Sequence, residues 1–208
     1  MIADQRLFLT QLVTLVAVLD PVSHLSLFWA ATTRLSPAER RRAAFAGVGL
    51  ALVVITTFGW LGQYVLDAMG ISLLSFQIAG GVIILLFALT MVLGSAPASV
   101  ETTGESWRSL AVYPLAVPVL AGPGSLLTVM VLVDNNRFSS ADQALTLAAL
   151  LVVLAILLGL FLLAEPLSRL LEGAGTNVIR RVMGLLLAAL AVNLVLNALA
   201  TWLHLPPP

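Results

Sequence analysis

One acidic residue, Asp20, lies near the middle of a long apolar segment, Leu7–Ala31, and a proline follows it directly. A carboxylate near the centre of a membrane span costs several kcal/mol unless it is paired or solvated, so its presence indicates a function. Pro21 interrupts helical hydrogen bonding, and a broken helix at membrane depth is tolerated only inside protein or beside a cavity. Asp20 is therefore predicted to carry a proton, to bind a cation or to pair with a substrate ammonium group. The structural alternative is pairing with a polar neighbour such as His24 or Asn193.

A second break is expected at Gly122-Pro123-Gly124-Ser125, inside another apolar run and with two further prolines one or two turns earlier. Glycine permits a sharp bend and proline removes an amide donor, so a new half-helix should begin after each break. The first turn of a helix exposes unpaired N–H groups at the positive end of its dipole, where carboxylates bind. The amides of Gly124 and Ser125 are predicted to hold a substrate carboxylate, and those of Ser23 and His24 are placed equivalently. The alternative is an ordinary proline kink between packed helices.

The remaining candidates are a histidine and an asparagine. His24, four residues after Asp20, could tune or relay a proton, or serve as a hydrogen-bonded packing residue. Asn193 in the last apolar run could contact substrate or bond to a neighbouring helix. The predicted substrate-binding set is Asp20, Pro21, Ser23, His24, Gly122, Pro123, Gly124, Ser125 and Asn193, with Asp20 as the proton-coupling residue. No metal site or other cofactor is expected, because the chain has no cysteine and only two histidines.

The elements that must position these residues are membrane spans. The chain has 208 residues, of which 60% are hydrophobic and 10% charged, and its mean hydropathy is +1.07. Such a composition indicates an integral membrane protein, and a spanning helix needs about 20 apolar residues. The sequence predicts six spans: Leu7–Ala31, Ala43–Leu66, Ile71–Gly94, Leu110–Val133, Ala144–Ala164 and Val182–Leu203. Zero net charge gives no reason to expect nucleic acid as a partner, so membrane lipids are the expected surroundings.

The basic residues predict an orientation. All ten are arginines, and eight of them fall in the first, third and fifth loops: Arg34, Arg40, Arg41, Arg42, Arg108, Arg169, Arg180 and Arg181. Because cytoplasmic loops carry an excess of basic residues, these three loops are predicted to be cytoplasmic and both termini to lie outside.

The two halves of the chain correspond weakly. The segment from Leu19 to Ser23 aligns with Ala121 to Ser125 at an offset of 102, and two helix starts align at an offset of 103. These starts, Ser36 and Ser139, each have an acid three residues later that can close a capping box. The chain is therefore predicted to be a single membrane domain, 1–208, with repeat one at about 1–94, a linker at about 95–109 and repeat two at about 110–203. Three spans per half force opposite orientations, which is the inverted-repeat plan of many secondary transporters.

Four motifs together resemble the MarC family of bacterial and archaeal inner-membrane proteins: Val18-Leu19-Asp20-Pro21, Leu35-Ser36-Pro37-Ala38-Glu39-Arg40-Arg41, Phe76-Gln77-Ile78-Ala79-Gly80-Gly81 and Ala121-Gly122-Pro123-Gly124. The resemblance covers essentially the whole chain. It implies an all-α fold of six spans in an inverted three-plus-three repeat, with spans one and four broken. It also implies proton-linked transport of small neutral amino acids such as glycine and alanine.

The chain departs from the family pattern beside the predicted site. After the Asp-Pro pair the family usually has an apolar residue and then Gly-Asn, whereas this chain has Ser23 and His24 as the second and third residues after Pro21. The family usually has Asp where this chain has Thr90, and Gln where it has Asn193. The loss of a glycine and the gain of a larger ring are expected to shrink or re-tune the pocket.

Three functions are compatible with the residues. The favoured one is a secondary transporter in which the two halves rock around a midplane site, with a small zwitterionic amino acid bound between a carboxylate and helix amides. A passive channel is the alternative, since paired half-helices also build pores. An intramembrane enzyme is the least favoured and the chain is not expected to be one, although Ser125 and His24 could in principle form a nucleophile and its base.

Overall fold

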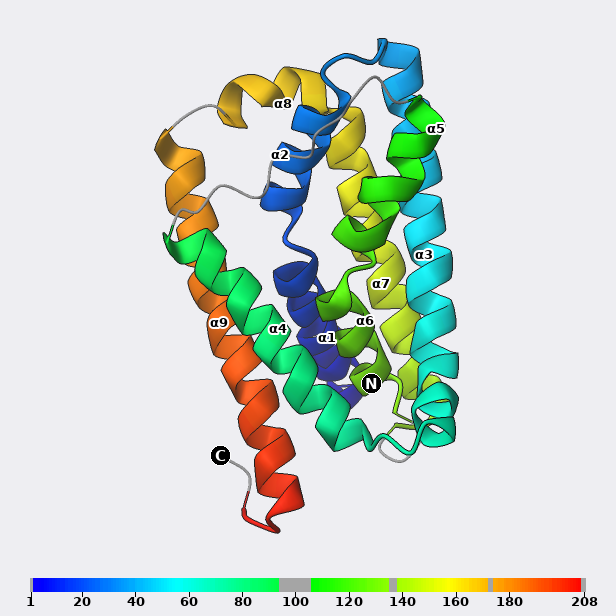
Figure 1. Ribbon diagram of the computed structural model, residues 1–208, viewed down its shortest axis with the longest axis vertical. Coiled ribbons are helices and arrows are strands. Elements are labelled where there is room, and N and C mark those ends of the chain that lie inside the picture. Colours follow the sequence, from blue (N-terminus) through cyan, green and yellow to red (C-terminus); the bar gives the residue numbers. More distant parts are fainter. Residues whose placement is uncertain (1, 94–105, 135–137, 172–173, 207–208) are drawn as a thin grey trace.

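The computed structural model of the chain describes residues 2–93, 106–134, 138–171 and 174–206, with the side chains of 2–4, 168–177, 179 and 180 left out (Figure 1). The elements of the first half are α1 (Ile2–Leu19), α2 (Pro21–Thr32), α3 (Pro37–Ala68) and α4 (Leu73–Leu93). Those of the second half are α5 (Trp107–Leu110), the irregular helical segment η1 (Ala111–Leu120), α6 (Pro123–Leu132), α7 (Ser140–Leu162), α8 (Ala164–Leu171) and α9 (Ala174–Trp202). The predicted linker falls mostly outside the described residues, and its last residues are already helical in α5.

The helices form a membrane-spanning bundle. Within the described residues, five helical stretches are long and apolar enough to cross a membrane: Gln5–Thr32, Pro37–Ala68, Leu73–Leu93, Ser140–Leu162 and Arg181–Trp202. The pair formed by Trp107–Leu120 and Pro123–Leu132 bends by 58° and gives a sixth crossing if it spans as one unit. The prediction of an all-helical membrane protein is therefore confirmed, with five to six candidate spans and one bent pair.

Two helix starts have the local chemistry that the sequence predicts. Ser36 caps α3 by accepting a bond from the Glu39 amide, and the Glu39 carboxylate accepts one from the Ser36 amide. Ser139 and Asp142 form the same capping box at the start of α7. These reciprocal bonds satisfy helix-end amides that lack a partner in the helix. They fix where the second span of each half begins.

Successive spans run alternately up and down in Figure 1, followed from blue to red. The turn before α3, the short helix α5 and helix α8 all lie at the upper end, so arginine-bearing segments meet there. Arg40 at the start of α3 pairs with Glu165 of α8 at 3.1 Å, and its guanidinium lies 4.5 Å from the centre of the Trp29 ring. The first and fifth loops thus lie at one end of the bundle, as the arginine pattern requires.

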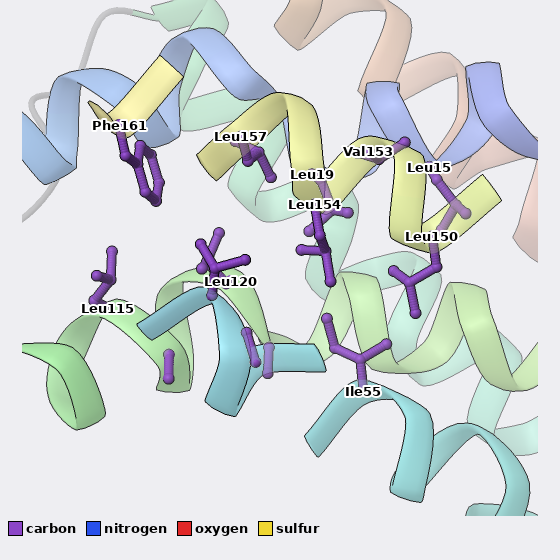
Figure 2. Packing of buried hydrophobic residues seen from close by; sticks show 14 of the residues in the cluster. Leu15, Leu19, Ile55, Leu115, Leu120, Leu150, Val153, Leu154, Leu157 and Phe161 are labelled. Atoms are coloured by element: carbon purple, nitrogen blue, oxygen red, sulfur yellow. The ribbon is translucent and has the colours of Figure 1, made fainter. Parts of the chain in front are cut away.

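A tightly packed core lies along α7. Leu150, Val153, Leu154, Leu157 and Phe161 recur at helical spacing and are almost fully buried. Figure 2 shows them facing Leu15 and Leu19 of α1, Ile55 of α3, and Leu115 and Leu120 of η1. The rings of Phe28 on α2 and Phe161 stack with their centroids 4.3 Å apart. Both broken spans are therefore anchored against the same rigid surface.

Helices α4 and α9 form a second unit. They make the most extensive helix–helix contact of the described residues, α4 also packs on α6, and α9 touches α1 and α2 only sparingly. A Cβ added to Gly81 would lie 2.7 Å from a methyl carbon of Val195, so glycine permits the close approach of α4 and α9. The Gln77 side chain of α4 donates to the Leu194 carbonyl at 3.0 Å. Because α4 belongs to the first half and α9 to the second, this division cuts across the halves that were predicted to rock as units.

Candidate functional site

The first break is a single residue, Asp20, between α1 and α2. Its backbone is left-handed (φ 33°, ψ 78°), a conformation in which Asp and Asn are enriched among non-glycine residues. One carboxylate oxygen, Oδ1, accepts a hydrogen bond from the Ser23 amide at 3.4 Å and so caps α2. The residue is fully buried, and Oδ2 has no hydrogen-bond partner among the described residues. Asp20 thus shapes the break, and its second carboxylate oxygen is buried and available to a ligand.

The second break is longer than the sequence predicts. Tyr113 and Val117 have extended backbones inside η1, because each precedes a proline. The helix resumes only at Pro123. A Cβ on Gly122 would lie 2.6 Å from the Pro118 carbonyl oxygen, so only glycine fits there. The break therefore extends well before the predicted Gly122-Pro123-Gly124 turn.

Ser125 stabilises the second break from within. Its hydroxyl lies 2.7 Å from the Leu120 carbonyl oxygen and 3.0 Å from that of Gly122, and it donates to these acceptors. His24 bonds to other groups, so the described contacts do not form the nucleophile–base pair considered for an enzyme. The role that the geometry gives the Ser125 side chain is to hold the turn.

The two breaks meet through His24. Its Nδ1 lies 2.9 Å from the carbonyl oxygen of Asp20, one turn earlier in the chain. Its Nε2 lies 2.8 Å from the carbonyl oxygen of Val119, in the second break. The ring is 5% exposed. A single side chain therefore links segments that are 95 residues apart in sequence.

A cavity of about 300 Å³ opens beside this link. One side consists of His24 and residues 118–120 and 122–125 of the second break, among which His24 and Ser125 have polar side chains. Its apolar wall comes from Val18, Leu27, Ile83, Ile84, Phe87 and Leu187, the last four on the α4–α9 pair. This volume is at the lower end of the range of about 300–1,000 Å³ that ligand pockets occupy. The cavity suits a small solute with an apolar part.

The two half-helix starts differ in whether they are free to bind an anion. At α2, the Ser23 amide is already bonded to the Asp20 carboxylate. At α6, no side chain caps the helix, and the first backbone bond runs from the Leu126 amide to the Gly122 carbonyl oxygen. Helix geometry leaves the amides of Gly124 and Ser125 ahead of that bond, and both residues line the cavity. The site that could hold a carboxylate is therefore the start of α6.

The structure brings together five of the nine predicted site residues at the cavity: His24, Gly122, Pro123, Gly124 and Ser125. Asp20, Pro21 and Ser23 form the first break but do not line the cavity in this conformation. The expectation that the Ser23 amide holds substrate is corrected, because Asp20 already occupies that amide.

Asn193 does not line this cavity. It is exposed on α9, whereas Leu187 and Ala191 on the same helix are buried towards α4. Two residues along a helix correspond to a rotation of about 200°, so Asn193 points away from the face that Ala191 presents. Thr90 is also exposed and bonds to the Phe87 carbonyl of its own helix. Of the departures from the family pattern, only those at Ser23 and His24 lie beside the breaks.

Two buried polar features were missed by sequence reasoning. Gln11 on α1 is 1% exposed, and neither polar atom of its side chain has a partner among the described residues. Asp134, just after α6, is buried, and its carboxylate accepts a hydrogen bond from the side-chain Nε2 of Gln63 at 3.2 Å. Gln11 could have been found by weighing every polar residue inside a span, and Asp134 lies one residue beyond the predicted end of span four.

Comparison with known proteins matches residues 5–203 to the model of the MarC family integral membrane proteins. A UPF0056 membrane protein of Methanocaldococcus jannaschii is 32% identical, over 94% of this chain and 97% of its own length. From Escherichia coli, the UPF0056 membrane protein YhcE is 31% identical, over 89% of this chain and 88% of its own. The UPF0056 inner membrane protein YhgN of the same organism is 29% identical, over 92% and 95%. No solved structure matches.

Proposed function

The chain belongs to the MarC family of integral membrane proteins, and on this basis we propose that it is a secondary transporter of small neutral amino acids. The proposed setting is the inner membrane of a bacterium or archaeon, with the arginine-rich end in the cytoplasm and both termini outside. The two halves would form an inverted repeat, with the breaks of spans one and four meeting at the bilayer midplane.

The observation that carries the proposal is the uncapped start of α6 at the wall of the cavity. A substrate carboxylate placed there would accept bonds from the amides of Gly124 and Ser125 at the positive end of the helix dipole. The mostly apolar wall would receive a hydrogen or a methyl group as the substrate side chain. A cationic side chain would find no carboxylate among the described cavity-lining residues.

Asp20 supplies the opposite pole of the proposed site. Its Oδ2 is buried without a hydrogen-bond partner among the described residues, a costly arrangement that a substrate ammonium group would relieve. Asp20 does not line the cavity in the present conformation, so substrate must reach it after a rearrangement of the breaks. The rearrangement that we propose is a movement of the α4–α9 pair against the remaining helices, because the cavity lies between the pair and the second break.

Uptake of radiolabelled glycine and alanine into proteoliposomes, with and without an inward proton gradient, tests this function. Wild-type protein is expected to accumulate both amino acids, and Asp20→Asn is expected to abolish accumulation. Unlabelled alaninamide lacks the carboxylate and propionate lacks the ammonium group, so neither should compete with labelled alanine. Absence of uptake under any imposed gradient would refute the transporter, and flux that does not saturate would instead favour the passive channel.

A further inference from the structure

Both ring nitrogens of His24 have a backbone acceptor within hydrogen-bond distance. Both ring nitrogens point at backbone carbonyl oxygens, Nδ1 at Asp20 and Nε2 at Val119, with distances of 2.9 and 2.8 Å. A carbonyl oxygen only accepts hydrogen bonds, and a neutral imidazole has a single N–H to donate. Both bonds form at once only when the ring is the doubly protonated imidazolium.

We infer that His24 carries the coupling proton, and that its protonated ring latches the second break to the first. This inference deepens the proposed function, on which it rests for the meaning of the coupling. The family resemblance points to Asn at this position, so the latch belongs to this chain's own sequence. The sequence alone favours Asp20 as the proton carrier, whereas the geometry gives the proton to the imidazole and leaves Asp20 free for the substrate.

The charged groups around His24 are few. On its own segment it faces Asp20, which is buried in the same break. The elements packed against α2 are α5, η1, α7, α8 and α9. Among the described side chains, their titratable groups are Arg108, Tyr113, Asp142, Glu165 and Arg181. None of these five lines the cavity. The side chains of Arg169 and Arg180 are not among those described. The α4 and α6 walls contribute no titratable residue.

Loss of the proton acts on the link between the breaks. The proton leaves Nε2 for water in the cavity, because His24 lines the cavity and its Nδ1 is bonded to the Asp20 carbonyl. The ring then keeps Nδ1–H on the Asp20 carbonyl, and the Nε2 lone pair faces the Val119 carbonyl oxygen in place of a donor. The bond between the breaks is lost and the neighbouring lone pairs repel. The second break is then free to move, and with it the adjacent substrate amides of Gly124 and Ser125.

The protonation state is measured by ¹⁵N NMR on histidine-labelled protein in nanodiscs. His204→Asn removes the other histidine, which lies near the end of α9, and leaves His24 as the only signal. Both ring nitrogens are expected to be protonated at the lower end of the pH range in which the protein is folded, with a single deprotonation at Nε2 as pH rises. A ring with only one protonated nitrogen throughout this range would overturn the inference.

The latch is measured with a single cysteine, since the chain has none. Leu120→Cys places a thiol at a fully buried position beside Val119, and Leu187→Cys provides a second reporter on α9 if the first does not fold. At each pH, the rate of thiol modification in the folded variant is divided by the rate in the same variant unfolded. This ratio removes the intrinsic pH dependence of the thiol. The ratio is expected to rise about tenfold or more as His24 deprotonates, as for loss of a hydrogen bond from a charged donor.

The control is the same reporter in the His24→Asn background, where the ratio should not follow pH. An equal rise in that background would overturn the latch. None of these measurements uses substrate, so they separate the latch from the proposed function. A working latch without amino acid uptake would refute the proposed function alone. Gradient-driven uptake that persists unchanged in His24→Asn would refute the coupling role of His24 alone.

Discussion

Replacing Asp20 by Asn, Gly or Ala separates its two roles, shaping the first break and supplying a carboxylate. The residue has a left-handed backbone and its Oδ1 accepts the Ser23 amide bond that caps α2. Asn keeps a side-chain acceptor and tolerates the left-handed region. Gly tolerates the backbone but has no side chain, and Ala satisfies neither requirement. Stability should therefore depend on geometry and transport on charge, so the two rankings should differ.

The expected magnitudes follow from the two local terms. Removing a side-chain cap costs about 1 kcal/mol when Ala replaces Asp and a few tenths when Gly does. A non-glycine residue without a local hydrogen bond costs about 1–2 kcal/mol in the left-handed region. Asp20→Ala should therefore lose about 2–3 kcal/mol of unfolding free energy, and Asp20→Gly less than about 1 kcal/mol. Asp20→Asn should be close to wild type, because it removes a buried charge that has an unpartnered oxygen.

Denaturant unfolding in detergent micelles gives the stability ranking, and proteoliposome uptake of alanine gives the transport ranking. The free energy of unfolding should decrease in the order Asp20→Asn, Asp20→Gly, Asp20→Ala. All three variants should fail to accumulate alanine. An Asp20→Ala protein as stable as Asp20→Asn would refute the capping and left-handed argument. An Asp20→Asn protein that accumulates alanine normally would refute the role of the carboxylate while leaving the structural argument intact.

Three further substitutions test the packing and the site. Gly81→Ala should lower the free energy of unfolding by about 1–3 kcal/mol, because the new methyl group overlaps α9. The control is Gly49→Ala, which has open space around it and should be neutral or stabilising. Thermal unfolding of both variants checks this. Asn193→Ala should leave alanine uptake within about twofold of wild type, since the residue is exposed away from the cavity and exposed substitutions have small effects; a large loss would return Asn193 to the site. Gly124→Ala narrows the cavity, so KM for alanine should rise more than KM for glycine, and equal changes would argue against substrate at the start of α6.

The helices and their starts could be predicted from local sequence. Hydrophobic length predicts the spans, and the capping boxes at Ser36 and Ser139 lie where the spacing of serine and acid places them. The first break is equally local, because the Asp20-Pro21 pair interrupts the helix by its own backbone chemistry. The extent of the second break was underestimated, although its signal is also local, because a proline directly after Tyr113 and after Val117 disfavours helical backbone at both residues.

The composition of the site could be predicted only in part. The sequence indicated which polar residues lie at the two breaks but could not tell which amides remain free, because this depends on the Asp20 side chain folding back onto Ser23. It could not exclude Asn193 either, because the exposed face of α9 is decided by its packing against α4.

By itself, the sequence determined the membrane class, the helices and the two breaks, because hydrophobic length, helix caps and proline act over a few residues. Only the tertiary structure decided that His24 reaches the Val119 carbonyl, and that helices from both halves pair as α4 and α9. These features join residues about a hundred positions apart. They depend on the shape of packed surfaces, which no local pattern encodes.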